Sequence, residues 1–440
     1  AEIEFVEMPE FYLKQINQKE KMKEIAKKLN FYSPLSRNIL LEWINSISID
    51  WPISRRRYYA TEIPLWYCKE CNFVIIPKKG KYYRPWKEKA PVKQCSKCKS
   101  KEFRGETRVF DTWFDSSITP LYILMYERND VFFKKAFPCS LRPQGKEITR
   151  TWLYYTLLKC YLLTGKLIFN DVWINYHIVD DTGLKMSKSK GNVIGPKDVL
   201  DKFGAEPFRL WAAVEGNLEK IDFKCSFERI EGAGKTINKL WNVARFISMF
   251  PESKKPSKLE ELDLWIINEI NAITKFTKER YEKYDFHNPA VKLRSFIWET
   301  FASHYIELVK SRAYNQDKKF TKQQQDSALF TLHYCLDRLL KLLSPIIPFC
   351  TYKIYKDLRN KDIHFEEFPK IDKINKISFS TNDIVELNTK IWKAKKDKGL
   401  SLKDGVRNLI VSKKLEWIKD DLIATHSVKE IKFGKFNVSF

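Results

Sequence analysis

The sequence predicts an α/β region followed by an all-α region, with a small mixed α+β segment at the end. Between residues 109 and 215, strand-like runs such as 173–179 alternate with helical runs at 148–163 and 196–203. This alternation is typical of a parallel sheet covered by helices. After Phe227 the strand signal fades, and long amphipathic stretches indicate a helical bundle. These stretches cover residues 237–250, 262–284, 289–313 and 323–343.

The chain before the α/β region has two different characters. Residues 13–48 carry apolar side chains at helical spacing, interrupted at Ser33-Pro34, and therefore predict two helices. Residues 52–108, here called the cysteine module, are rich in Pro, Tyr, Cys and Lys and show no helical period. The chain ends with a helical run at 387–398 and β-like pieces at 409–411 and 431–438. The expected domains are residues 1–51, 52–108, 109–221, 222–375 and 376–440.

The composition excludes wholesale disorder and indicates a basic protein. Hydrophobic residues make up 44% of the 440 positions and charged residues 30%. The net charge of +24 favours a polyanionic partner such as nucleic acid, although a Lys-rich coding bias explains it equally well by itself. No segment approaches the ~18 apolar residues of a membrane span, and the opening lacks the apolar centre of a secretory signal. We therefore expect a cytoplasmic protein without a membrane partner.

Four of the nine cysteines form two Cys-x-x-Cys pairs in the cysteine module. Two such pairs together supply the four thiolates of a tetrahedral structural Zn²⁺ site, which has no open position for catalysis. Two redox pairs or unpaired buried thiols are the alternatives. A module without helical periodicity needs a ligand to hold it, so zinc is the favoured interpretation. The expected ligands are Cys68, Cys71, Cys95 and Cys98.

The most specific string is Lys-Met-Ser-Lys-Ser-Lys at residues 185–190, here called the lysine loop. It follows a predicted strand and the turn at 180–183, and it precedes a predicted helix. Two lysines on such a loop can surround a triphosphate and offset the charge that develops on leaving pyrophosphate. A solvated basic loop is the alternative for any isolated pair of lysines.

Several strings resemble the class I aminoacyl-tRNA synthetases. The lysine loop resembles the signature loop of that family, and residues 53–57 and 60–68 resemble the segment that leaves the inserted editing domain. Further resemblances lie at residues 111–117, 142–152 and 343–349. Three strings are most similar to archaeal-type valyl-tRNA synthetases: Ala60-Thr61, residues 116–120 and residues 142–145. The leucine and isoleucine enzymes usually have Trp-Gly at positions 59 and 60.

The resemblance implies a fold, substrates and roles for individual residues. The fold is the second half of a Rossmann-like catalytic domain with a zinc knuckle, an anticodon-binding helical bundle and an α+β appendage. The substrates are valine, tRNA(Val) and ATP with Mg²⁺, and Lys185 and Lys188 would stabilise the adenylation transition state. The implied sites are Lys185, Met186, Ser187, Lys188, Ser189, Gln144 and Gly145 for ATP or the adenylate, Trp152 and Glu147 for valine, and Lys239, Trp241, Asn242 and Arg245 for tRNA.

Some features of the family are missing or altered. The 440 residues contain no His-x-Gly-His signature, which binds ATP in class I synthetases, and almost no editing domain. We therefore expect the C-terminal half of a split or shortened enzyme, working with a separate N-terminal half that carries both. Tyr176 and Leu184 replace a usual Gly and a usual basic residue. An isoleucyl- or leucyl-tRNA synthetase fragment and a noncatalytic tRNA-binding paralogue remain as alternatives.

Overall fold

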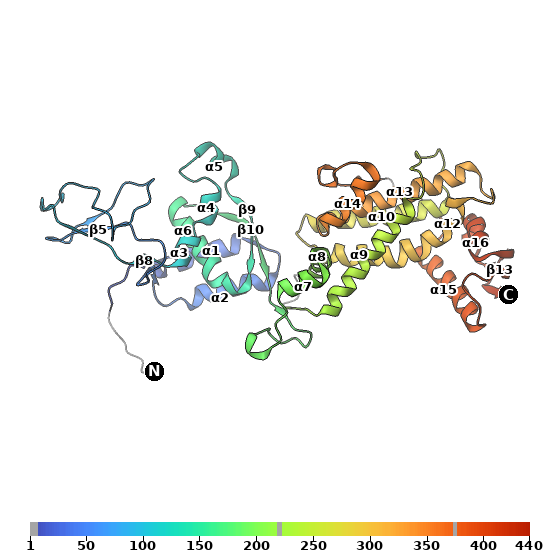
Figure 1. Cartoon of the computed structure of the whole chain (residues 1–440), viewed down its shortest axis with the longest axis horizontal. Coiled ribbons are helices and arrows are strands. Elements are labelled where there is room, and N and C mark those ends of the chain that lie inside the picture. Colours follow the sequence, from blue (N-terminus) through green and yellow to red (C-terminus); the bar gives the residue numbers. More distant parts are fainter. Residues whose placement is uncertain (1–7, 218–221, 373–375) are drawn as a thin grey trace. The chain divides into compact units, whose positions relative to one another are not determined.

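The computed structural model describes residues 8–217, 222–372 and 376–440, and divides the chain into two compact units. The first unit is Ala1–His177 and the second is Ile178–Phe440 (Figure 1). The expected domain boundaries at 221 and 375 fall outside the described residues. The boundaries at 51 and 108 stay predictions.

A parallel three-stranded sheet forms the centre of the first unit. Its strand order is β2-β10-β9, and Asp171 of β10 pairs with both Asn30 of β2 and Leu141 of β9. Helix α6 connects β9 to β10, because parallel neighbours need a long crossover. Val172 and Ile174 are fully buried beneath helices that contribute Ile25, Leu40 and Leu157 among others. The elements are α1 (Lys19–Lys28), β2 (Asn30–Phe31), α2 (Pro34–Ser46), β9 (Cys139–Gly145), a 3-10 turn (Lys146–Ile148), a π-helical turn (Thr149–Leu153), α6 (Tyr154–Thr164) and β10 (Phe169–Asn175).

The cysteine module is built from short strands and loops. Three strands form a small antiparallel sheet in the order β6-β5-β7, and its buried apolar side chains include Ile63, Trp66 and Ile75. Such a small core indicates that the module depends on another source of stability. The strands are β5 (Trp66–Cys68), β6 (Val74–Ile75) and β7 (Phe103–Gly105). The other elements of the first unit are β1 (Tyr12–Leu13), β3 (Trp51–Pro52), β4 (Ser54–Arg55), β8 (Val109–Phe110), α3 (Thr112–Ser116), α4 (Thr119–Ile123) and α5 (Asp130–Ala136).

The strand expected over residues 173–179 is interrupted in the structure. Strand β10 ends at Asn175, and β11 (Ile178–Val179) pairs instead with β12 (Phe223–Lys224) in the second unit. Between them, the Tyr176 hydroxyl lies 2.8 Å from the Ser33 hydroxyl and 3.0 Å from that of Ser36. The strand-like run is continuous in sequence, but its two parts have different pairing partners.

The second unit begins around the lysine loop and continues as a helical bundle (Figure 1). Helix α13 packs against both α10 and α12. The buried Arg312 guanidinium binds Asp263 at 2.6 and 3.0 Å and Asp421 at 2.9 Å, which ties the bundle to the C-terminal segment. The helices are α7 (Pro196–Phe203), α8 (Ala205–Glu215), α9 (Phe227–Ile247), α10 (Glu261–Tyr281), α11 (His287–Ser295), a π-helical segment (Phe296–Tyr305), α12 (Ile306–Tyr314), α13 (Lys322–Leu343) and α14 (Pro348–Arg359).

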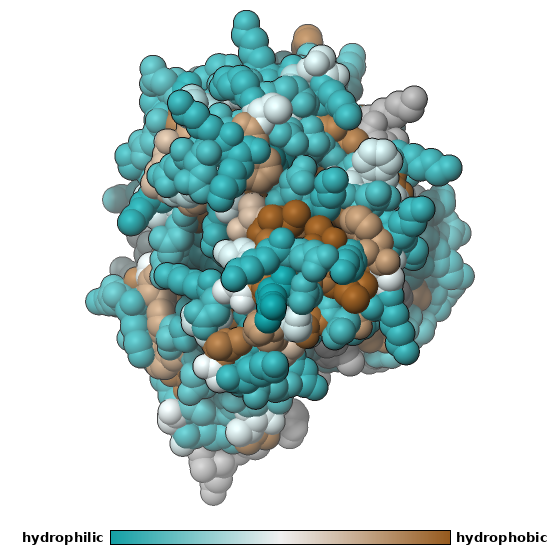
Figure 2. Space-filling view, turned by 90° about the vertical axis from the view of Figure 1, so that its right-hand side faces the viewer, coloured by the Kyte–Doolittle hydropathy of each residue, from teal (hydrophilic) through white to brown (hydrophobic). Residues whose placement is uncertain are grey.

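The C-terminal segment is a small α+β structure packed on the bundle. Its sheet has the order β14-β13-β15, with β14 parallel and β15 antiparallel to β13. The face of the molecule in Figure 2 is mainly hydrophilic, with apolar residues gathered near its centre. In the described part of the chain, no helix is long and apolar enough to cross a membrane. The elements are α15 (Thr381–Asp397), β13 (Val406–Val411), a 3-10 helix (Lys413–Ile418), α16 (Lys419–His426), β14 (Val428–Phe433) and β15 (Asn437–Ser439).

Candidate functional site

The lysine loop is held in place by a hydrogen-bond network on Asp180 and Asn192. Asp180 Oδ1 accepts from the backbone N–H of Thr182 at 3.1 Å and of Leu184 at 2.8 Å. Asn192 donates to Asp180 Oδ2 at 2.7 Å and accepts from the backbone N–H of Ser187 at 2.9 Å. The Thr182 hydroxyl, the Asn192 amide and these backbone groups lower the pKa of Asp180 to about 2. The network therefore stays charged and intact at neutral pH.

The side chains of the lysine loop differ in exposure. Met186 packs against the core of the second unit, whereas Lys185 and Lys188 are exposed. A short 3-10 turn over Lys188–Lys190 ends at Gly191, whose φ of +67° suits glycine. Neither Lys185 nor Lys188 forms an ion pair with another described residue. The arrangement presents two free ammonium groups on a fixed backbone, as a phosphate ligand requires.

Arg142 connects two of the residues implicated in substrate binding. Its guanidinium lies 3.4 Å from the centre of the Trp152 ring, and its Nε donates to Gln144 Oε1 at 3.1 Å. The Trp152 indole N–H donates to the Ser116 carbonyl at 3.0 Å, which fixes the edge of the ring. Arg142 is only 5% exposed, and burial lowers its pKa to about 10. Charged side chains are mostly exposed, so the burial of Arg142 differs from what its residue type predicts. The resemblance assigned Arg142 no role.

Glu147 and Gly145 lie at the end of strand β9. The Glu147 side chain is exposed and folds back over Gly145, and its carboxylate lies 3.6 Å from His177 Nε2. Gln144 is buried and donates to the Gly145 carbonyl at 3.4 Å. Arg142 thus joins Gln144 to Trp152, and Gly145 follows Gln144 in the strand. The exposed Glu147 carboxylate lies beside His177 at the end of this strand.

The four cysteines of the two Cys-x-x-Cys pairs converge on one point. Their Sγ atoms all lie within 4.8 Å of one another, with Cys68 and Cys98 at 3.4 Å and Cys71 and Cys95 at 3.6 Å. These distances are far longer than a disulfide, and all four cysteines are free. Tetrahedral thiolate ligands 2.3 Å from a metal lie about 3.8 Å apart, so the cluster fits a four-coordinate ion.

The two cysteine pairs have the same backbone turn. The N–H of Asn72 donates to the Cys68 carbonyl at 3.0 Å, and the N–H of Lys99 donates to the Cys95 carbonyl at 3.0 Å. Asn72 and Lys99 both have positive φ angles, of 53° and 67°. Each turn folds a Cys-x-x-Cys pair so that both thiols face the same point.

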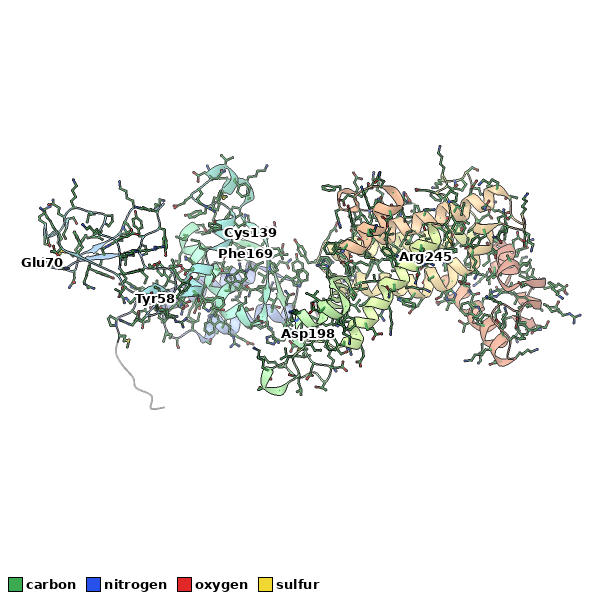
Figure 3. The ribbon with its side chains drawn as sticks, in the orientation of Figure 1. Tyr58, Glu70, Cys139, Phe169, Asp198 and Arg245 are labelled. Atoms are coloured by element: carbon green, nitrogen blue, oxygen red, sulfur yellow. The ribbon has the colours of Figure 1, made fainter. Side chains whose placement is uncertain are left out.

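Helix α9 presents three of the four tRNA candidates on its exposed face. Trp241, Asn242 and Arg245 are exposed, and Trp241 and Arg245 line a small pocket of about 150 Å³ against α14 (Arg245 is labelled in Figure 3). Lys239 lies one turn before Asn242 on the same helix and is half-buried, with its ammonium 5.3 Å from the centre of the Trp298 ring. The structure therefore brings Trp241 and Arg245 together at one pocket, which Asn242 and Lys239 do not line.

Two domain families match this chain. The family described as tRNA synthetases class I (I, L, M and V) matches residues 3–224, and the anticodon-binding domain of tRNA ligase matches residues 263–410. The chain is 42% identical to the valine–tRNA ligase of Nanoarchaeum equitans over 98% of its own length and 56% of that protein. It is 40% identical to the valine–tRNA ligase of Pyrobaculum aerophilum, over 98% of its length and 55% of that protein. The chain thus spans little more than half of these relatives.

Two solved structures share the fold at low identity. One is a leucyl-tRNA synthetase of Agrobacterium radiobacter K84 in a ternary complex with tRNA and LeuAMS, with a TM-score of 0.56 and 17% identity. It covers 89% of this chain and 51% of its own. The other is methionyl-tRNA synthetase of Mycobacterium tuberculosis bound by methionyl-adenylate, with a TM-score of 0.55 and 16% identity. It covers 78% of this chain and 62% of its own.

Proposed function

This chain belongs to the class I tRNA synthetases of the isoleucine, leucine, methionine and valine group, and on that premise we propose that it carries part of a valine–tRNA ligase. Two regions expected from the sequence match known domain families: the Rossmann-like catalytic region and the anticodon-binding helical region. The observation that carries the choice of valine is the identity of 42% and 40% to two archaeal valine–tRNA ligases over 98% of the chain.

The proposed reaction has two steps. A carboxylate oxygen of valine attacks the α-phosphorus of ATP, the bond to the bridging oxygen breaks, and pyrophosphate leaves with the negative charge. A hydroxyl of the terminal tRNA ribose then attacks the valyl carbonyl carbon and releases AMP. Mg²⁺ accompanies ATP and shares the phosphate charge. The protein contributes positioning and electrostatic stabilisation, which supply most of the rate enhancement in phosphoryl-type transfers.

Residues of both units have assigned parts in this proposal. Lys188 and Lys185 offset the charge on the departing pyrophosphate, and the Asp180–Asn192 network keeps their backbone fixed while they do so. Gln144 and Gly145 contact the adenylate, Trp152 forms a wall of the valine pocket, and Glu147 holds the amino group or ribose. The His-x-Gly-His residues and the editing site belong to another half, supplied by the same polypeptide or by a separate chain.

We propose that the four-cysteine cluster binds a structural Zn²⁺. The supporting observations are the convergence of the four Sγ atoms within 4.8 Å and the paired turns that aim them. Four thiolates leave the metal no open position, so it would hold the module together and take no part in the reaction.

The Arg142–Trp152 stack predicts a specific effect on amino-acid binding. Arg142→Lys keeps the charge but loses the flat guanidinium that lies on the Trp152 ring and the Nε–H bond to Gln144. We expect the KM for valine to rise about tenfold, and the KM for ATP to change less than about threefold. Steady-state exchange kinetics of the completed enzyme measure both constants.

A matched control for this variant is Arg128→Lys. The Arg128 guanidinium lies 4.0 Å from the centre of the exposed Tyr122 ring, so the same change is made at a surface stack. The control should leave the KM for valine unchanged. An Arg142→Lys enzyme that loses valine and ATP affinity equally would show that Arg142 has only a general structural role.

The exposed face of α9 predicts a contribution to tRNA affinity. Trp241 is 40% exposed, and a base from an anticodon loop can stack on such a ring. We expect Trp241→Ala to weaken tRNA(Val) binding about five- to tenfold and to leave tRNA-independent ATP–pyrophosphate exchange unchanged. Filter binding with labelled tRNA(Val) measures the first effect. The control is Trp417→Ala, at a Trp that is 69% exposed elsewhere in the second unit, and an equal loss there would contradict the assignment.

The proposed function is tested by aminoacylation. The chain is combined with a half that carries His-x-Gly-His, and charging of tRNA(Val), tRNA(Ile) and tRNA(Leu) is measured with each of the three amino acids. Valine on tRNA(Val) is the expected product. Preferential charging with isoleucine or leucine would replace the proposal with one of those enzymes, and a folded complex that binds tRNA(Val) without charging it would indicate a noncatalytic paralogue.

A further inference from the structure

The turn before the lysine loop is tied to two helices by one arginine. Arg229 lies in the first turn of α9, and its Nε donates to Asp181 Oδ1 at 3.1 Å. A second guanidinium nitrogen donates to Glu215 Oε1 at 2.9 Å, at the C-terminal end of α8. Helices α8 and α9 pack against each other, so this arginine joins three segments of the second unit (Figure 1).

The arginine contacts the tip of a tight hairpin, residues 179–185, here called the loop hairpin. Val179 and Lys185 form an antiparallel bridge, and the backbone N–H of Asp180 donates to the Leu184 carbonyl at 2.9 Å. The chain passes from this hairpin directly into the lysine loop. A displacement of the tip is therefore carried to the lysines through a short, hydrogen-bonded length of backbone.

The position of Arg229 at the start of α9 is itself fixed. The Ser226 hydroxyl caps this helix and accepts from the Arg229 backbone N–H at 3.4 Å. Just before the cap, β12 pairs with β11, and the backbone N–H of Cys225 donates to the Val179 carbonyl at 2.9 Å. This pairing attaches the loop hairpin at its base, and the Arg229 side chain adds a second attachment at its tip.

The charges around Arg229 favour a positioning role over direct binding of phosphate. Its side chain is 39% exposed, and the two carboxylates that it contacts compensate its charge. Hydrogen bonds to Asp181 and Glu215 raise the pKa of Arg229, so the guanidinium stays charged and the contact persists at neutral pH. The ammonium groups of the lysine loop have no such ion pair with a described residue and remain available to an anion.

We propose that Arg229 is a positioning residue, which holds the loop hairpin against α8 and α9 and so fixes where the lysine loop presents its ammonium groups. The inference rests on the proposed function, because it concerns the position of Lys188 during the reaction. Charge stabilisation of this kind depends on groups that are already in place when the charge develops. Arg229 therefore acts through Lys188 and does not contact ATP.

The enzymatic test is valine-dependent ATP–pyrophosphate exchange by the chain completed with a half that carries His-x-Gly-His. Arg229→Ala should lower kcat about fivefold, the upper end of what an exposed ion pair contributes. The KM for valine should change less than about twofold, because the affected charge develops only after valine is bound. Arg229→Lys keeps the charge but loses the planar fork that spans two carboxylates, and should recover part of kcat.

A double-mutant cycle with Asp181 separates positioning from a simple effect of charge. Asp181→Ala should lower kcat as much as Arg229→Ala does, and the double variant should be no worse than either, because all three lack the same contact. An arginine that only neutralised Asp181 beside the phosphates would behave differently. Asp181→Ala would then retain activity and would restore it in the double variant, and this result would overturn the proposal.

The matched control is Arg359→Ala, at the end of α14. Arg359 also bridges two carboxylates, with Glu252 at 2.8 Å and Asp337 at 3.6 Å. Its replacement should leave kcat and the KM for valine within about twofold of the original values. An equal fall of kcat in Arg359→Ala would show that any such ion-pair loss slows the enzyme, and would refute a specific role for Arg229.

Hydrogen exchange tests the contact on the chain alone and requires no enzymatic activity. The hydrogen-bonded amides of residues 182–187 should exchange about fivefold faster in Arg229→Ala and in Asp181→Ala, but not in Arg359→Ala. At about 1 M salt, where the Debye length is about 3 Å, this difference should shrink below about twofold. Unchanged protection in Arg229→Ala, or a difference that salt does not reduce, would contradict an electrostatic attachment of the tip.

The two measurements distinguish failure of this inference from failure of the proposed function. If the completed original enzyme is active and Arg229→Ala retains its kcat, the positioning role is refuted and the enzyme assignment stands. If Arg229→Ala loosens the loop hairpin but no completed chain shows valine-dependent activity, the contact is confirmed. The enzyme assignment then falls, and with it the catalytic purpose of the contact.

Discussion

Replacing Lys188 by Ala is expected to lower valine-dependent ATP–pyrophosphate exchange by about 10²- to 10³-fold, the usual effect of removing one group that stabilises transition-state charge. Lys188 is exposed, and its ammonium forms no ion pair with another described residue, so its removal leaves the fold intact. The loss should fall on kcat, with little change in the KM for valine, because the charge it balances develops only as pyrophosphate leaves.

Two further variants separate this role from a general effect of charge. Lys190→Ala removes a neighbouring exposed lysine of the same 3-10 turn and should change exchange less than about threefold. Lys188→Arg keeps the charge and should recover part of the activity. Binding of tRNA(Val) should remain nearly unchanged in all three variants. Exchange within threefold of the original enzyme in Lys188→Ala would remove the role assigned to this residue.

Loss of the proposed zinc site is expected to unfold the cysteine module while leaving the helical bundle folded. The module has short strands, and its buried apolar side chains are few, so the metal would supply most of its stability. Structural zinc contributes about 10 kcal/mol or more in comparable small modules. In Cys71→Ser and Cys95→Ser, amide hydrogens of residues 66–105 should exchange at least tenfold faster. Those of α10 and α13 should be unaffected.

Hydrogen exchange with mass spectrometry measures this effect, and elemental analysis measures the metal. The original chain should contain one zinc per molecule, and each variant much less. Cys139→Ser is the control, because Cys139 is a half-buried cysteine outside the cluster. A metal-free chain with undiminished protection at residues 66–105 would show that the four thiols are structural without a metal.

Local sequence patterns were sufficient for most helices of this protein. Residues 196–203 were expected to be helical, and α7 covers Pro196–Phe203, because Pro at the first position and a following Gly mark its ends. The stretch at 323–343 corresponds to α13, whose capping box at Thr321 and Gln324 fixes its start. The extent of each of these helices depends on residues close in sequence, because the apolar period sets the helix and the capping residues set its ends.

Features that depend on distant partners were not predictable. The strand-like run at 173–179 divides because β10 pairs with β9, whereas β11 pairs with β12 about 45 positions further along the chain. Arg142 is buried because Trp152, Gln144 and Thr156 surround its guanidinium. The charge of the Arg142 side chain by itself predicts an exposed position. Strand alternation places Arg142 and Gln144 on the same face, and this was the available signal.

The candidate site was predictable to different degrees. The cysteine spacing was enough to predict the convergence of four thiols, because two Cys-x-x-Cys turns have few other uses in a loop-rich module. Side-chain exposure was not predictable for Trp241, which lies on a helical stripe that is usually buried but is 40% exposed here.

ATP–pyrophosphate exchange decides whether this chain carries the lysine-loop half of a valine-activating enzyme. Exchange is measured with valine, isoleucine or leucine, on the chain alone and together with a half that carries His-x-Gly-His. We expect exchange that requires both the second half and valine. Robust exchange by the chain alone, or exchange in the completed enzyme that depends on isoleucine or leucine instead of valine, would contradict it.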